Sequence, residues 1–267
     1  MSRSSWWLVL LVCAAVLLRV VLALRPGIWG DEIFSLAMAT GHSLEHPAAE
    51  ARPELRDFVE PQPAVPSGTF RRYVEHDHPP ATPARVIRAV ALSDTNPPLY
   101  YLLLGVWTRL FGAGDAALHL FSVACAIAAL PIIWRLGRDL GGDRVGGTAV
   151  LLFALSPVSL FYSVEGRMYS LLWVLAAALA WVTLGLTRRG FSPLLAGAWV
   201  VLGAAGLLTH YFFLFTWCGL LAWLAWSGWR QHRWAVVGVA LLTVLAVSPW
   251  YSQLSASLGR WRVTGDW

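Results

Sequence analysis

Long apolar runs alternate with short polar connections along most of the chain. A helix that crosses the apolar core of a bilayer needs about 20 apolar residues. Segments with this length, or close to it, occur at 6–24, 115–134, 145–163, 168–187, 192–208, 211–229 and 234–251. The pattern predicts an all-α polytopic membrane helix bundle of about seven transmembrane helices, in which residues 1–267 form a single membrane domain.

One apolar run is too short for a span. It covers residues 97–111, begins with Pro97 and Pro98, and carries Arg109 near its end. Fifteen residues of helix rise only about 22 Å, whereas the apolar core is roughly 30 Å thick. We therefore expect an interfacial or re-entrant helix at 97–111.

A long polar loop, residues 25–96, separates the first predicted span from this short helix. It holds 10 of the 15 acidic residues and 9 of the 15 prolines. Two short interfacial helices are predicted in it. Asp31–Thr40 begins after Gly30 and stops at Gly41, and Pro83–Leu92 has Thr82 as its cap and proline at its first position.

The arginines predict the orientation of the spans. The connections on one side hold Arg135, Arg138, Arg144, Arg188, Arg189, Arg230 and Arg233. The short connections on the other side hold Arg167, and the tail adds Arg260 and Arg262. By the positive-inside rule the N-terminus is cytoplasmic, while the 25–96 loop and the C-terminus are extracytoplasmic.

Composition supports the membrane class and excludes some chemistry. Hydrophobic residues make up 57% of the chain and charged residues 13%, against about 25% charged in soluble domains. All 20 cationic residues are arginines, which excludes lysine Schiff bases and the Walker A lysine. The net charge of +5 lies at the ends of apolar runs, so we expect no nucleic-acid partner.

The acidic pair Asp31 and Glu32 follows the outer end of the first span. Apolar neighbours flank it, Trp29 before and Ile33 after. Two carboxylates in such a setting can acquire separated or raised pKa values, which suits a general base. The alternative is that they only cap an interfacial helix.

Three other polar strings are expected near the same membrane face. Asp94 and Asn96 precede the two prolines, where they either face a cavity or form a plain turn. Glu165 and Arg167 share a short turn, where the arginine either clamps a phosphate or pairs locally with the acid. His210 and Tyr211 interrupt an apolar stretch and either line the same cavity or mark a turn.

The remaining ionisable residues are less informative. We expect Arg19, in the outer part of the first span, to extend its side chain to the interface. The sequence does not indicate a role for His119, which lies near the outer start of the second span. His76-Asp77-His78 has alternating donors that could bind a divalent metal, although two loop histidines more often bind nothing specific.

Four strings in order resemble one family. They are Trp29-Gly30-Asp31-Glu32, Asn96-Pro97-Pro98-Leu99-Tyr100-Tyr101, Tyr162-Ser163-Val164-Glu165-Gly166-Arg167-Met168-Tyr169 preceded by Ser156-Pro157, and Thr209-His210-Tyr211. Together they resemble the GT-C membrane glycosyltransferases of the protein-mannosyltransferase and aminoarabinose-transferase superfamily. The resemblance extends over nearly the whole chain.

The resemblance implies a function. Such enzymes take a sugar from a polyprenyl-phosphate donor at the extracytoplasmic face of the plasma (inner) membrane and transfer it to a lipid, glycan or protein acceptor, usually with inversion. By analogy Asp31, with Glu32 beside it, is the catalytic carboxylate. Arg167 would bind the donor phosphate, helped by Asn96 and the loop arginines Arg71, Arg72, Arg85 or Arg88. The cavity would be lined by Asp94, Tyr100, Glu165, His210 and Tyr211.

Two departures from the family keep other interpretations open. Asn96 stands where relatives often have His or Lys, and the chain ends at Trp267 after seven predicted spans, whereas relatives have more. A fragment, a short form or a half-site completed by a second membrane chain are alternatives, and so is a lipid or solute transporter. These residues identify no cofactor with certainty, and a divalent metal stays an alternative.

Overall fold

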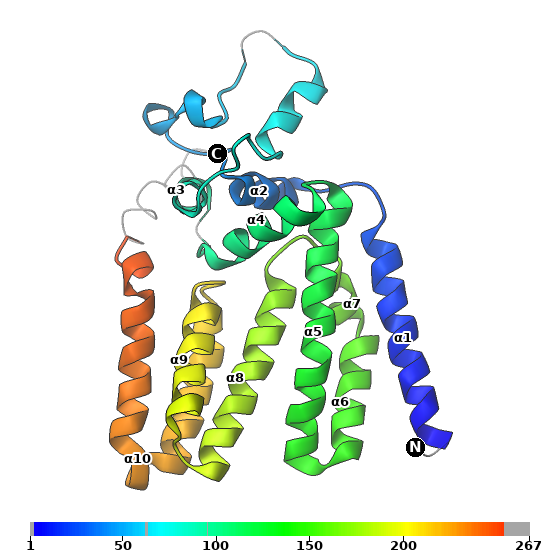
Figure 1. The fold of residues 1–267 in the computed structure, drawn as a ribbon, viewed down its shortest axis with the longest axis vertical. Coiled ribbons are helices and arrows are strands. Elements are labelled where there is room, and N and C mark those ends of the chain that lie inside the picture. Colours follow the sequence, from blue (N-terminus) through cyan, green and yellow to red (C-terminus); the bar gives the residue numbers. More distant parts are fainter. Residues whose placement is uncertain (1–2, 62–63, 95, 254–267) are drawn as a thin grey trace, which may run out of the picture.

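The computed structural model describes residues 3–61, 64–94 and 96–253, and within them every regular element is helical. Six helices stand side by side, with the N-terminal end of α1 at the lower end of the bundle (Figure 1). They are α1 (Arg3–Ala23), α5 (Asp115–Gly141), α6 (Asp143–Leu155), α8 (Tyr169–Arg189), α9 (Pro193–Leu207) and α10 (Phe213–Tyr251). The predicted all-α class is confirmed.

The membrane assignment holds, but the number of spans is only partly supported. Four segments of the described chain are long and apolar enough to cross a bilayer: Trp6–Ala23, Asp115–Gly141, Tyr169–Arg189 and Gln231–Tyr251. A bent pair, α6 with α7 (Pro157–Ser163), brings the number to five. Pro193–Leu207 and Phe213–Gly228 lie where two spans were predicted but have at most 17 residues. The chain is a polytopic membrane protein, and seven spans stay a prediction.

The helix ends differ from the predicted ones for identifiable reasons. The second predicted span, 115–134, continues to Gly141, because helix hydrogen bonds do not require apolar side chains and hydropathy marks only the apolar part. The last two predicted spans correspond to two helices that follow each other directly within α10 and meet at a kink, where His232 has a non-helical backbone. The tail with Arg260 and Arg262 lies outside the described residues.

The span predicted at 145–163 is bent in the structure, and whether it crosses the bilayer stays a prediction. The axes of α6 and α7 meet at 62°. Ser156 has extended backbone and caps α7, and Pro157, which lacks an N–H group, begins it. The break therefore follows from two adjacent residues that favour a helix start.

The structure also corrects the expectation for Arg19. Its side chain does not reach the interface but is buried, with 3% of the residue exposed. The guanidinium donates to the Ala154 carbonyl at 2.8 Å and to Ser159 Oγ at 3.0 Å. Arg19 thus ties α1 to the bend, where a carbonyl freed from helix bonding needs a donor.

Three short helices form a layer across the upper end of the bundle (Figure 1). These are α2 (Gly30–Thr40), α3 (Pro83–Ser93) and α4 (Leu99–Phe111), close to the predicted 31–40, 83–92 and 97–111. Gly41 ends α2 with φ of 88°, and Thr82 Oγ1 accepts from the Arg85 N–H at the start of α3. A Cβ on Gly105 would meet the Ala39 carbonyl oxygen at 2.6 Å, so glycine allows α4 to pack closely on α2.

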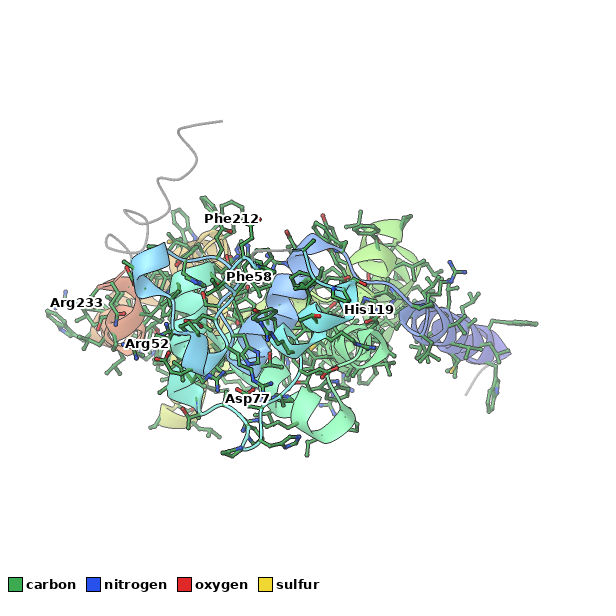
Figure 2. The ribbon with its side chains drawn as sticks, turned by 90° about the horizontal axis from the view of Figure 1, so that it is seen from above. Arg52, Phe58, Asp77, His119, Phe212 and Arg233 are labelled. Carbon is green, nitrogen blue, oxygen red and sulfur yellow. The ribbon has the colours of Figure 1, made fainter. Side chains whose placement is uncertain are left out.

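Between α2 and α3 the loop carries three 3₁₀ turns at Ala48–Glu50, Pro53–Leu55 and Ser67–Tyr73. Seen from above, Arg52, Phe58 and Asp77 lie over the middle of the molecule, while α1 projects at one side (Figure 2). The loop is held together by ion pairs, in which the Asp57 side chain is fully buried and Arg56 is exposed. Asp57 binds Arg88 at 2.7 Å, and Asp77 binds Arg85 at 2.6 Å and Arg56 at 2.9 Å. Burial opposes ionisation of Asp57, but Arg88 and two backbone N–H groups outweigh it and lower its pKa.

Candidate functional site

Arg167 is the centre of a group of charged side chains at the upper end of the bundle. It lies in the turn between α7 and α8 and is only 8% exposed. Its Nη1 donates to the Asp31 carbonyl at 3.2 Å and to Ser35 Oγ at 3.3 Å, and its Nη2 is 3.9 Å from Asp31 Oδ2. Its Nε is buried and has no partner among the described residues. One of the donors of this arginine is therefore unpaired in the part of the chain that the structure describes.

Asp31 and Glu32 are adjacent in sequence, yet their environments differ. The Asp31 side chain is 51% exposed and that of Glu32 only 4%. Asp31 points one carboxylate oxygen toward Arg167, whereas Glu32 is directed into the protein. Of the predicted acidic pair, only Asp31 is open to a ligand.

Glu32 joins three segments. Its Oε1 accepts from the Gly166 N–H at 2.6 Å and lies 3.1 Å from His119 Nε2, and its Oε2 accepts from the Trp29 N–H at 3.1 Å. Burial opposes its ionisation, but these three partners together outweigh burial and lower its pKa. Glu32 therefore holds α2, α5 and the α7–α8 turn together as a carboxylate.

Glu165, in the same turn as Gly166, has a raised pKa, whereas the pKa of Glu32 is lowered. Burial and then the nearby Glu32 raise its pKa, and its Oε2 is buried with no hydrogen-bond partner in the described chain. Its backbone carbonyl accepts from Ser122 Oγ at 2.5 Å. The turn is thus fixed by its backbone, while one oxygen of its carboxyl group is buried and unpaired among the described residues. We call Asp31, Glu32, Glu165 and Arg167 the charged cluster.

Asp94, Asn96 and Tyr101 form a second polar group beside the charged cluster. Asp94 Oδ1 accepts from the backbone and the side-chain nitrogens of Asn96, both at 3.0 Å, and Oδ2 accepts from the Tyr101 hydroxyl. Tyr100 and Tyr101 are buried, and burial raises the pKa of both. Both tyrosines and Asp94 are near enough to Arg167 to affect its ionisation.

His210 and Tyr211 lie between α9 and α10 with different surroundings. Burial and then the positive Arg167 lower the pKa of His210, which places it near the charged cluster. Its Nδ1 accepts from the Phe212 N–H at 3.0 Å, so a neutral ring carries its proton on Nε2. The Tyr211 hydroxyl accepts from Trp250 Nε1 at 3.3 Å and its ring packs on Tyr251. Whether both residues line one cavity with Asp94, Tyr100 and Glu165 stays a prediction.

The other loop candidates make contacts among themselves. Asp77 binds arginines and His42, and His76 Nε2 lies 2.9 Å from Thr108 Oγ1. Within the described residues no three His, Cys, Asp or Glu side chains gather as a metal-ligand group. Arg85 and Arg88 are paired with Asp77 and Asp57, and Arg71 and Arg72 contact Glu75 and Tyr73. Of the candidate phosphate ligands, Arg167 lies beside Asp31.

Sequence reasoning left His119 undecided and did not select Ser35, Tyr101 or Ser122 for a role. His119 comes from α5, and its two ring nitrogens face the Ala23 carbonyl oxygen at 3.3 Å and Glu32 Oε1 (Figure 2). The available signal was a polar residue near the outer start of an apolar helix. The partner, 87 positions away, could not be inferred from local pattern.

The fold and the charged cluster define a polytopic helical membrane protein with an acid and an arginine side by side at one end of its bundle. Residues 95–252 match the family model described as dolichyl-phosphate-mannose-protein mannosyltransferase. Because the match covers more than half of the 267 residues, the chain belongs to this family and is a glycosyltransferase of GT-C type.

Comparison with curated proteins and with solved structures gave no match. The matched range includes Asn96, Tyr100, Glu165, Arg167, His210 and Tyr211. It begins after Asp31 and Glu32. The connection of this acidic pair to the family region therefore rests on the contacts with Gly166 and Arg167 described above.

Proposed function

We propose that this glycosyltransferase moves a sugar from a polyprenyl-phosphate donor to an extracytoplasmic acceptor. The observation that carries the proposal is the approach of Asp31 Oδ2 to Arg167 Nη2, 3.9 Å, next to a buried Arg167 Nε that has no partner in the described chain. A half-exposed carboxylate beside an arginine with an unused donor suits an acceptor hydroxyl next to a phosphate.

In the proposed reaction Asp31 accepts the proton of the acceptor hydroxyl as its oxygen bonds to the anomeric carbon of the sugar. The bond between that carbon and the phosphate oxygen breaks, and the electron pair leaves with the polyprenyl phosphate. Attack from the face opposite the leaving group inverts the anomeric centre. Arg167 stabilises the charge that accumulates on the phosphate, and such electrostatic stabilisation is a large contribution to catalysis.

Glu32 has a positioning role in this proposal. Its carboxylate is occupied by Gly166, His119 and Trp29, so it keeps the Arg167 turn against α2. Asn96, though assigned to the donor phosphate by resemblance, is held by Asp94, and the two would border the sugar. Tyr100, Glu165, His210 and Tyr211 would line the remaining cavity.

We place the charged cluster on the extracytoplasmic side of the plasma membrane and the N-terminus in the cytoplasm. In support, the lower end of the bundle, where α5 and α8 end and α6 begins, carries Arg135, Arg138, Arg144, Arg188 and Arg189. Cytoplasmic connections are rich in arginine and lysine. The bilayer and the lipid-linked donor are then the partners of the chain.

The test is to incubate the purified chain with a panel of polyprenyl-phosphate sugars and follow donor consumption by mass spectrometry. Consumption of one donor, with release of polyprenyl phosphate and loss of activity in Asp31→Asn, is expected. Full activity of Asp31→Asn would contradict the assigned base. If the wild type consumes no donor but co-purifies with a second multi-span chain, a non-catalytic subunit is indicated. Solute uptake by proteoliposomes without transfer would indicate a transporter.

A further inference from the structure

A separate pocket lies at the lower end of the bundle, remote from the charged cluster. It has a volume of about 240 Å³ and lies where α5 and α8 end and α9 begins (Figure 1). Trp181, Val182 and Leu195 contribute apolar surface to it, and Arg188 and Arg189 contribute the cations. The mixture is typical of a ligand with one charged and one apolar part.

The two arginines are placed by the end of α8. Arginine is favoured in the last turn of a helix because the free carbonyl groups there carry partial negative charge. Arg188 donates to the Asp139 carbonyl, at the end of α5. Arg189 is exposed and makes no hydrogen bond or ion pair with the described residues. One arginine is thus fixed at the pocket and the other is free to bind an anion.

Asp139 is the one acid of this pocket, and its carboxylate is already engaged. Oδ2 accepts from Trp181 Nε1 at 2.8 Å, and Oδ1 is 3.9 Å from Arg138 Nε. Arg138 therefore offsets the charge of Asp139, and the two arginines of α8 keep the pocket cationic. Removing the Asp139 charge is expected to strengthen anion binding.

The apolar walls favour a lipid over a soluble anion. Val182 and Leu195 belong to helices that are apolar along their length, so acyl chains next to the pocket would lie against them. Trp181, an amphipathic ring, suits the level of lipid head groups. Basic pockets between membrane helices on the cytoplasmic side are known to hold anionic head groups.

From these observations we propose that the pocket between α5, α8 and α9 binds an anionic phospholipid. Its phosphate lies between Arg188 and Arg189, and its acyl chains lie along α8 and α9. The lipid joins the ends of three helices at the face opposite the charged cluster. The site does not depend on the proposed sugar transfer.

The test uses the full chain in neutral detergent, titrated with phosphatidylglycerol or phosphatidylcholine of the same acyl chains and followed by native mass spectrometry. We expect preferential retention of phosphatidylglycerol, reduced about 10-fold or more in the double variant Arg188→Gln/Arg189→Gln. Asp139→Asn should retain more lipid than the wild type. Equal retention of the two lipids, or an unchanged double variant, would overturn the proposal.

Two further comparisons separate the pocket from general surface charge. Arg135→Gln/Arg233→Gln removes the same charge from residues outside the pocket and should keep the lipid. Gly185→Leu should fill the pocket and abolish retention of the lipid. Gly185→Ala should retain the lipid, because a Cβ at this position meets Leu195 at an ordinary contact distance of 3.5 Å. Retention of the lipid by Gly185→Leu would show that the lipid binds outside this pocket. Competition by glycerol phosphate at equal concentration would assign the site to soluble phosphates instead.

Discussion

The Glu32 carboxylate accepts a hydrogen bond of 2.6 Å from the backbone N–H of Gly166, 134 positions further along the chain. This contact brings the first loop onto the turn that carries Arg167. It also requires glycine at 166, since a Cβ there would lie 2.4 Å from the Leu118 side chain. Glu32, the buried acid of the predicted pair, thus positions the exposed acid, Asp31, next to Arg167.

Glu32→Gln should destabilise the protein by about 2–3 kcal/mol, the scale of lost hydrogen bonds to a charged group. The folded protein lowers the pKa of Glu32 below its ordinary 4.5. Its contribution is therefore complete above pH 4.5 and is lost as the pH falls through the lower folded value. Thermal unfolding in detergent, measured against pH, should show wild type and variant converging in acid. A constant difference down to the lowest pH would contradict this role.

Asp31→Asn should reduce sugar transfer by roughly 10²–10⁴-fold, as expected for loss of a general base, with little effect on folding because Asp31 is half exposed. Asp31→Glu should retain part of the rate. Glu60→Gln, which removes another exposed loop carboxylate, is the matched control. The measurement is release of polyprenyl phosphate at equal amounts of folded enzyme.

Arg167→Gln should lower kcat/KM for the donor by about 10²-fold, the scale of one lost charge-stabilising contact. Arg167→Lys should recover a part, since it keeps the charge but not the several donors of the guanidinium. Arg71→Gln is the control, because it removes the same charge from an exposed loop arginine whose ion-pair partner is Glu75, at 3.7 Å. Measuring kcat/KM for the donor in both variants separates the contribution of the charge from that of the guanidinium hydrogen bonds. An effect confined to the acceptor KM would place Arg167 at the other substrate.

The local sequence pattern predicted where most helices lie, but not the α6–α7 bend or the contacts between distant segments. Thr82-Pro83 and Gly41 fix helix ends by local backbone chemistry, so α2 and α3 were predicted to within one or two residues. The roles of Arg19 and His119 depend on acceptors from distant segments, Ala154 and Glu32. Hydropathy reports the apolar length of a helix but not which polar group of another helix faces it.

The candidate site was predicted in part for the same reason. Each of its short polar segments was identified separately, and the distribution of arginines among the connections predicted that these segments lie at one end of the bundle. The different exposure of Asp31 and Glu32 was not predictable, because adjacent residues have the same local pattern. It arises from the packing of α2 on α4 and from the contacts of the Glu32 carboxylate with His119 and Gly166, which bury the second acid and leave the first at the surface.

Glu165→Gln should stabilise the protein at neutral pH. Burial raises the pKa of this carboxyl, so its ionisation costs folding free energy at every pH above the folded value, and an uncharged amide avoids the cost. We expect the unfolding temperature to rise by roughly 2–4 °C near pH 7. The gain should vanish as the pH falls through the raised pKa and below 4.5. A loss of stability at neutral pH would mean that the charge is needed by Arg167.

Arg19→Leu should destabilise the protein, by about 2–3 kcal/mol, although it replaces a charge with an apolar side chain inside an apolar helix. The variant leaves the Ala154 carbonyl at the α6–α7 bend without its donor, and an unsatisfied backbone group away from water costs this much. Arg19→Gln, which keeps a donor, should lose less. Unfolding temperature in detergent measures both.

A control distinguishes this capping role from simple removal of a cation. Arg25→Leu takes a charge from just beyond the end of α1, at an exposed residue, and should leave the unfolding temperature within about 2 °C, as surface substitutions do. If Arg19→Leu is as stable as Arg25→Leu, the freed carbonyl has another donor, and the bend is held by Ser156 and Pro157 alone. If it is less stable, the 62° bend depends on a side chain from the first helix, and α1 is part of the bundle rather than only its anchor.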